Sequence, residues 1–492
     1  MDKEPGYAEL SSLVIRGCKA ARVTVSATVE APGLPSMNLD GVGERVATEF
    51  RGAIRCAIRS AGYEMPRAAV RVELSAVDGR PMPYGFPTGL ELPVAAAMLA
   101  ASGQIPETSI EGRVLTGDLA HDGEVLPSRG LHLFQREIGA AGALLTSSKV
   151  DGKALPERLG GCPALGIGNL SALREGPQAQ EKMEAVEIAG PDVDMADVRI
   201  DEKTAQAIEV ACAGGHNLLL YGSDFGFVKR VAERVATCLP VPSAAECGRA
   251  AAVESVVGDF RETASLGSRP CITWDADLCS LGSLVGGGRP VRPGAVSRAD
   301  GGVLVIENMS RISDVAAHML NSIIRDKSVR LVRADGKFTM PADAMVIGCM
   351  EPGAKLPEPL RNSTFVCVEV NEREDAGRTF TSAEIRERVV EARAFARDAT
   401  GLREAISDEP WDLVARTVAD LEGSHLVDVD HQRDALEMTK PDTWNLFNAA
   451  APVYAPERSL DELTAAATLE SSAASAAQED RAASAAREDG TR

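Results

Sequence analysis

The chain has 492 residues, which is too many for one hydrophobic core and indicates two to four domains. Its net charge of −20 excludes a general attraction to phosphate backbones, so contact with nucleic acid would need a local basic patch. The ten cysteines include no CxxC pair, which argues against a zinc site and a disulfide framework. We find no signal peptide and no apolar run near the ~20 residues that span a bilayer. We therefore expect a cytoplasmic bacterial protein without membrane contact.

Residues 1–176 have the pattern of a mixed α/β domain. Ala21–Val29 and Ala68–Ser75 predict half-buried strands. Gly43–Gly62 has helical spacing with Gly62 as its cap, and one face carries Val46, Phe50, Ile54 and Ile58. Gly89–Gly103 is almost entirely apolar, so we expect a helix that is buried on most sides.

The remaining chain divides where its composition changes. Residues 177–197 are polar and aperiodic, which indicates a linker. A second α/β domain is expected over 198–372, followed by a small helical segment over 373–450. Residues 451–492 are rich in Ala, Ser and charge, which indicates a disordered tail.

The segment Gly214–Leu239 predicts a strand, a loop and a helix, the context in which a phosphate-binding loop works. Such a loop has the form GxxxxGK followed by Ser or Thr. Its amides surround the phosphates, its Lys neutralises them and its hydroxyl holds Mg²⁺. Counted from Gly222, the Gly, Lys and hydroxyl positions are occupied by Phe227, Val228 and Lys229. The altered loop comprises Gly222, Ser223, Asp224, Phe225, Gly226, Phe227, Val228 and Lys229.

Two of these changes act directly against a polyanionic ligand. Asp224 places a negative charge in the loop, and at ~4 Å and an effective dielectric of ~20 such a contact costs on the order of 4 kcal/mol. The missing Lys removes a favourable interaction of similar size. Gly226 and Lys229 look like displaced remnants of the loop.

The second part of such a site is a buried strand that ends in two acids. Val303–Ile306 predict this strand, and Glu307 and Asn308 follow it. In a working ATPase the first acid supports Mg²⁺ and the second polarises the attacking water. Glu307 could still reach a metal through water, but Asn308 is neutral and cannot act as a base. The alternative interpretation is that both are polar strand ends without a ligand.

Longer segments show a family resemblance. "AIEVACAGGHNLLLYG" (Ala207–Gly222) resembles the start of the ATPase domain in magnesium-chelatase-like AAA+ proteins of the ComM/YifB group. Ala31–Pro66 and Leu90–Pro106 resemble that group's Lon-protease-like domain, and Val414–Leu436 resembles its C-terminal lid. The resemblance implies an α/β chain: a Lon-like α+β domain, a central AAA+ P-loop domain, a helical lid and a disordered tail. ATP and Mg²⁺ are the cofactors of this family.

The resemblance also assigns roles to positions that are altered here. Where the family continues as GPPGTGKT, this chain has GSDFGFVK. Glu351 stands at the position of the sensor Asn, and Ser363 at that of the arginine finger, with Arg361 two residues away. Glu91 stands where a peptidase-active Lon domain has its Ser. Thr88 and Lys149 are present, but no motif pairs them, so we expect a scaffold rather than a protease.

Two hypotheses follow, and both come from this family. The first is a non-hydrolysing scaffold or regulatory subunit that assembles with itself or with an active paralogue. Its loop "VGGGRPVRPGAVSR" could contact DNA through Arg289, Arg292 and Arg298, or it could be a solvated basic loop. The second is an active ATPase and DNA branch-migration helicase in natural transformation, which needs Lys229 to replace the missing Lys. Metal insertion into porphyrin needs the same ATPase and has no separate signal.

Overall fold

The computed structural model describes most of the chain before the tail. The described residues are 6–32, 34–76, 88–139, 142–148, 162–176, 181–182, 193–258, 269–288, 290–333, 336–361, 363, 365–372, 378–399 and 410–439. All of the described residues lie in the first of two units, Met1–Trp444. The predicted tail therefore lies outside the described residues.

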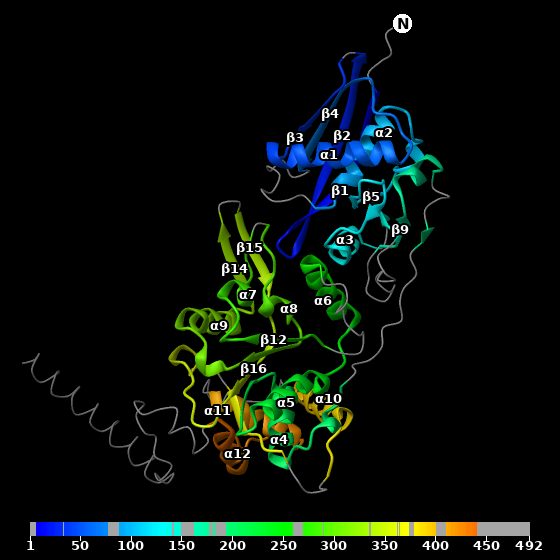
Figure 1. Ribbon diagram of the computed structural model, residues 1–492. Helices are drawn as coiled ribbons and strands as arrows, with labels where there is room; N and C mark the ends of the chain where they lie inside the picture. Colours follow the sequence, from blue (N-terminus) through cyan, green and yellow to red (C-terminus); the bar gives the residue numbers. More distant parts are fainter. Residues whose placement is uncertain are drawn as a thin grey trace, which may run out of the picture. The chain divides into compact units, whose positions relative to one another are not determined.

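An eight-stranded mixed sheet forms the N-terminal part of the first unit (Figure 1). Its spatial order is β10-β9-β8-β5-β1-β2-β4-β3. The long β1 and β2 are antiparallel, whereas β5 joins β1 in parallel. The strands are β1 (Gly6–Arg16), β2 (Lys19–Pro32), β3 (Ser36–Asp40), β4 (Ala68–Ala76), β5 (Val114–Leu115), β8 (Leu144–Ser147), β9 (Ala164–Ile167) and β10 (Glu181–Lys182).

Helices pack on this sheet through the faces that the sequence predicts. The predicted helix forms as α1 (Glu44–Ser60), which buries Phe50, Ile54 and Ile58, and Gly62 follows its end with φ 77°. The apolar segment forms α2 (Glu91–Ala101), in which every residue from Leu92 to Leu99 is buried. Further elements here are the hairpin of β6 (Asp118–Leu119) and β7 (Val125–Leu126), the helix α3 (Leu131–Ile138), and two short 3-10 helices at Glu107–Ser109 and Leu170–Arg174.

A five-stranded, fully parallel sheet forms the second part, in the order β12-β13-β16-β11-β17. Short apolar runs without alternation form four of these strands, as expected for a sheet covered on both faces, whereas the edge strand β12 is only partly buried. β11, the first strand along the chain, lies between the last two, so the direction of the crossover connections reverses beside it. The strands are β11 (Asn217–Tyr221), β12 (Cys271–Asp275), β13 (Val303–Glu307), β16 (Met345–Met350) and β17 (Phe365–Glu369).

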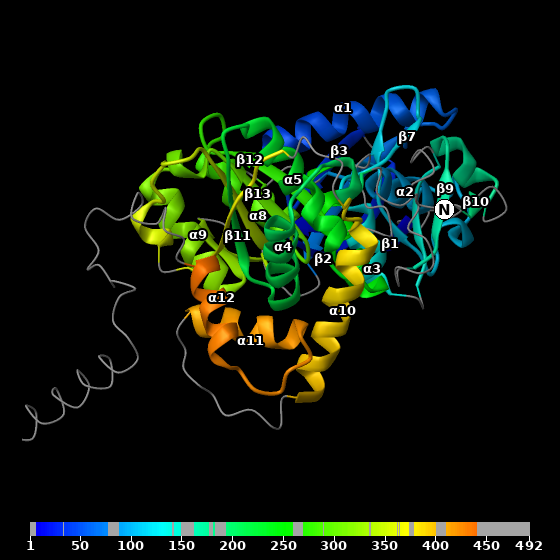
Figure 2. The same ribbon diagram turned by 90° about the horizontal axis from the view of Figure 1, so that it is seen from below.

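Helices cover this sheet, and the C-terminal helices pack against one of them. α5 packs against β11, β12, β13 and β16, and α4 packs against β11 and β17. Figure 2 shows α10, α11 and α12 grouped together, and α10 and α11 both contact α4. These helices are α4 (Glu202–Gly214), α5 (Phe225–Cys238), α6 (Ala244–Val257), α7 (Leu281–Val285), α8 (Ala295–Arg298), α9 (Asp314–Asp326), α10 (Ser382–Ala399), α11 (Pro410–Leu421) and α12 (Val429–Thr439). A hairpin of β14 (Ser328–Arg333) and β15 (Gly336–Pro341) follows α9.

The segment expected to be a linker is partly structured. Glu181–Lys182 pair with β9 as the edge strand β10 of the first sheet. Met195 is fully buried in the core of the second sheet, inside a short 3-10 helix that begins at a capping box on Asp194. None of the described helices is long and apolar enough to cross a membrane.

Candidate nucleotide site

The loop that follows β11 is short because helix α5 begins at Phe225. Asp224 is the N-cap of α5, and its Oδ1 accepts a hydrogen bond from the Phe227 amide at 3.0 Å. Amides at a helix N-terminus are the groups that bind a phosphate in a phosphate-binding loop. Here a carboxylate of the chain itself already occupies one of them.

Two of the three altered positions are part of the hydrophobic core. Phe227 and Val228 are both 0% exposed and belong to the cluster beneath the parallel sheet. Gly222 is required by close packing, because a Cβ there would lie 2.2 Å from the Val370 carbonyl oxygen. The side chain at the expected lysine position, Val228, therefore points into the core and away from the carboxyl edge of the sheet, where a ligand would bind.

Lys229 lies one turn inside α5 and reaches the end of the neighbouring strand β13. Its Nζ forms an ion pair with Glu307 Oε1 at 2.7 Å, and the Glu307 side chain is 12% exposed. The hydrogen bond to Glu307 is the main reason that the pKa of Lys229 is raised, and Glu233 and Asp275 add to it. The structure thus brings two of the sequence-predicted site residues together. Their charges neutralise each other instead of facing a phosphate or a metal ion.

The strand ends beside Glu307 complete a polar cluster. Asp275 ends β12 and is paired in register with Glu307. Asn308 adopts a left-handed conformation with φ 51°, and its Nδ2 lies 3.4 Å from Asp275 Oδ1. This amide can orient a carboxylate, but it cannot accept a proton from water at neutral pH.

The sensor-equivalent and finger-equivalent residues have other surroundings. Glu351 follows β16 and is exposed. Ser363 Oγ donates a hydrogen bond to Asn321 Oδ1 of α9 at 2.9 Å. Arg361 Nε donates to the Leu356 carbonyl oxygen at 3.3 Å. None of these contacts links the three residues to the Lys229–Glu307 pair.

The basic loop has its arginines in different environments. Arg289 lies outside the described residues. Arg292 is exposed, and partial burial followed by the charge of Arg129 lowers its pKa. Arg298 forms a two-point ion pair with the buried Glu254 of α6, at 2.7 and 3.0 Å. Its charge is therefore compensated within the protein.

In the N-terminal part, Glu91 has a structural role. Its Oε2 accepts a hydrogen bond from the Leu119 amide at 2.7 Å, and Asp118 Oδ1 accepts one from the Gly89 amide at 2.6 Å. These reciprocal bonds hold the start of α2 against the β6–β7 hairpin. Burial raises the pKa of both carboxyls. Thr88 is half-buried, and Lys149 lies outside the described residues.

These residues do not fit ATP and Mg²⁺. One of the amides that would bind phosphate, that of Phe227, is capped by Asp224, and the acid that would support Mg²⁺ is paired with Lys229. A γ-phosphate would have to displace the first carboxylate and separate the second pair. Neither position 228 nor position 308 supplies the charge that phosphoryl transfer requires.

Sequence reasoning missed the acids around Lys229. Asp275 was not identified because its strand was not predicted, although the segment "CITWD" ends in an acid as β13 does. In a parallel sheet, acids that end two strands meet at the carboxyl edge. Glu233 lies four residues after Lys229 on α5, so helical spacing alone places it on the same face.

This architecture is an α/β fold with a parallel sheet, consistent with an AAA+ P-loop domain. Two models of a protein family match the chain: "Magnesium chelatase, subunit ChlI" over residues 194–378 and "Subunit ChlI of Mg-chelatase" over residues 25–143. The chain belongs to the magnesium-chelatase-like family that includes YifB and ComM.

Three relatives illustrate this similarity. An uncharacterized protein of Mycobacterium tuberculosis is 29% identical over 347 residues, which are 69% of this chain and 68% of the relative. YifB of Salmonella typhimurium is 29% identical over 340 residues, with shares of 68% and 66%. The competence protein ComM of Haemophilus influenzae is 25% identical over 354 residues, with shares of 68% and 67%.

Proposed function

We propose that this chain is a non-hydrolysing member of its family, which acts as a scaffold or regulatory subunit. The observation that carries the proposal is the Asp224 carboxylate on the first turn of α5, where a phosphate would bind. The neutral Asn308 supports it, because even a bound nucleotide would lack the acid that activates water.

The rest of the chain has packed surfaces through which a scaffold could assemble with other subunits. The packed parallel sheet and helices α10–α12, the proposed lid, could assemble with a second copy or with an active paralogue in the cytoplasm. In the proposed Lon-like domain, Glu91 is hydrogen-bonded to the Leu119 amide, which favours a structural role over peptidase activity. DNA contact would come from Arg289 and Arg292, since Arg298 is paired with Glu254.

One observation favours the alternative function, an active ComM-like DNA branch-migration ATPase. The Lys229 ammonium lies beside the acid that would support Mg²⁺, only 2.7 Å away. A ligand that moved α5 could use both groups. The alternative still requires some other base in place of Asn308.

Nucleotide titration and phosphate release separate the two functions. The purified chain would be titrated with a fluorescent ATP analogue and Mg²⁺, and phosphate release measured with and without single-stranded DNA. We expect no turnover in either condition. Micromolar binding with turnover that Lys229→Met abolishes would overturn the proposal.

A rebuilt loop provides a second test. A variant in which Gly222–Lys229 is replaced by GPPGTGKT should still release no phosphate while Asn308 remains. Adding Asn308→Glu to that variant tests whether the second acid is the missing group. Hydrolysis by the rebuilt loop alone would contradict the role given to Asn308.

A further inference from the structure

A polar cavity lies at the amino edge of the parallel sheet, opposite the candidate nucleotide site. Its volume is about 360 Å³, which lies within the usual range of small-ligand pockets. Asn217 and Met345, the first residues of β11 and β16, line it, as does Gly302 before β13. It is therefore a separate feature from the carboxyl-edge cluster around Lys229.

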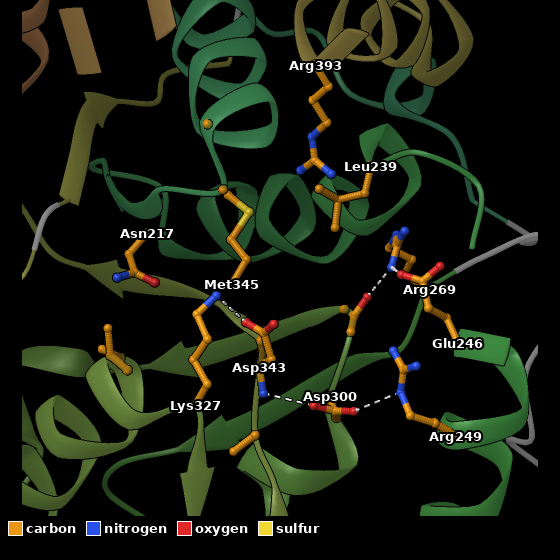
Figure 3. A pocket seen from close by; sticks show the side chains of 17 residues that line it. Asn217, Leu239, Glu246, Arg249, Arg269, Asp300, Lys327, Asp343, Met345 and Arg393 are labelled. Carbon is orange, nitrogen blue, oxygen red and sulfur yellow. Dashed lines mark hydrogen bonds and ion pairs between the residues drawn. The ribbon is translucent and has the colours of Figure 1, made fainter. Parts of the chain in front are cut away.

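Four cationic side chains from four segments line this cavity (Figure 3): Arg249, Arg269, Lys327 and Arg393. Three of them have a carboxylate nearby. Arg269 is paired with Glu246 at 2.9 Å, and Lys327 with Asp343 at 2.9 Å. Arg249 Nε is only loosely associated with Asp300, at 3.9 Å.

Arg393 differs from the other three cations. It is half-buried and extends from α10 into the cavity (Figure 3). Its Nε and Nη2 donate hydrogen bonds to the Cys212 and Ala213 carbonyl oxygens at the end of α4, the nearest at 2.5 Å. Within the described part of the chain no carboxylate forms an ion pair with it. Burial is the main reason that its pKa is lowered. The charge of Arg269 lowers the pKa further, whereas Cys212 and Glu246 act in the opposite direction.

A half-buried guanidinium beside a second guanidinium is unfavourable unless an anion compensates it. The carbonyl oxygens of α4 fix the orientation of Arg393 and leave its Nη1 without a protein acceptor among the described residues. The Nη2 of Arg269 and both terminal nitrogens of Arg249 are equally without one in that part of the chain. Guanidinium groups with free N–H donors are the side chains best suited to bind a phosphate by paired hydrogen bonds.

We propose that this cavity binds a small phosphate-bearing anion, with Arg393 as its central contact and Arg269 and Arg249 at its sides. The proposed binding does not depend on whether the candidate nucleotide site at the opposite edge binds or hydrolyses ATP. It joins α10 to the sheet, so an occupied cavity would stabilise the packing of the C-terminal helices on the rest of the domain.

Calorimetric titration of the full chain with inorganic phosphate, at constant ionic strength against chloride, tests this. We expect saturable binding that Arg393→Gln weakens roughly tenfold or more. Arg386→Gln is the matched control, because Arg386 also lies on α10 and donates to a carbonyl oxygen, that of Thr237, outside the cavity. It should leave the affinity unchanged. Equal affinity in all three proteins, or no saturable binding, would overturn the proposal.

A second variant and a second ligand complete the design. Arg249→Gln alters a half-exposed side chain on α6, so it tests the site even if Arg393→Gln fails to fold. It should weaken phosphate several-fold, and an unchanged affinity would count against the site. Repeating the titration with adenosine monophosphate distinguishes free phosphate from a phosphorylated metabolite. ATP-analogue binding that is lost in Arg393→Gln but kept in Lys229→Met would belong to this cavity and not to the nucleotide site.

Discussion

The ammonium of Lys229 and the carboxylate of Glu307 form an ion pair at 2.7 Å across the carboxyl edge of the parallel sheet. The pair connects the first turns of α5 to the end of β13. The acid is nearly buried, whereas the Lys229 side chain is 39% exposed. Removing the cation therefore leaves a poorly solvated negative charge beside Asp275.

Lys229→Met should lower the free energy of unfolding by about 1–2 kcal/mol. This is less than the loss expected when a fully buried ion pair is broken, because the lysine is partly exposed to solvent. Urea unfolding at pH 7 measures this. Lys229→Met with Glu307→Gln should recover much of the loss, because no unpaired charge remains. A double variant that shows the full sum of both single losses would contradict the coupling.

Asp224→Ala should destabilise the chain by about 1 kcal/mol, because it removes the N-cap of α5. Asp224→Asn keeps an oxygen acceptor at the same position, so it should cost only a few tenths of that. The free energies of unfolding of the two variants, measured in denaturant, separate the contribution of the capping hydrogen bond from that of the negative charge. Equal losses would mean that the negative charge, and not the hydrogen bond, stabilises the helix.

The two glycines of the altered loop should respond in opposite ways to alanine. At Gly222 a Cβ would meet the Val370 carbonyl at 2.2 Å, so we expect Gly222→Ala to cost more than about 2 kcal/mol. At Gly226, inside α5, the nearest atom is Asp224 Oδ1 at 3.2 Å. Gly226→Ala should be neutral or stabilise by up to about 1 kcal/mol. Thermal unfolding compares them, and a tolerated alanine at 222 would contradict the close packing.

Stability should fall in mild acid because of His216. Burial lowers its pKa to about 4, and its Nε2 lies 2.8 Å from Thr417 Oγ1 of α11. Below pH 6.5 the unfolded chain takes up a proton that the folded chain does not, so stability decreases from pH 6.5 towards pH 4. The slope from this residue is at most about 1.4 kcal/mol per pH unit. His216→Gln should reduce the slope measured in urea titrations, and an unchanged slope would exclude this origin.

The basic loop offers a prediction about DNA. Arg292→Gln should weaken binding to single-stranded DNA and reduce its dependence on salt. Arg298→Gln should instead reduce stability, because it leaves the buried Glu254 without its partner. Fluorescence anisotropy at several salt concentrations and urea unfolding would be measured on both. Weaker DNA binding in folded Arg298→Gln alone would reverse these assignments.

Much of the fold follows from sequence pattern. The strand at Val303–Ile306 was predicted from a continuous apolar run and the helix at Gly43–Gly62 from helical periodicity. Both are confirmed, because burial of apolar side chains dominates local structure. The strand, loop and helix predicted over Gly214–Leu239 also form. The first residue of α5 is set by the Asp224 carboxylate, which accepts a hydrogen bond from the Phe227 amide, and this contact is known only from the structure.

The candidate site was less accessible to sequence reasoning. Lys229 and Glu307 were each identified from the sequence. Their contact depends on the strand order, in which β16 alone lies between β11 and β13, and spacing along the chain does not predict that order. The partner of Arg298 could not be predicted either. Glu254 lies 44 residues earlier, on a helix whose position depends on tertiary packing.

The burial of Val228 also limits which side chains its position can accept. Its side chain is 0% exposed among aliphatic neighbours, so Val228→Lys would place an ammonium in the hydrophobic core instead of over a ligand. A single substitution of Val228 by lysine would therefore be strongly destabilising. For a lysine at this position to reach the carboxyl edge of the sheet, the whole first turn of α5 would have to unwind and change register.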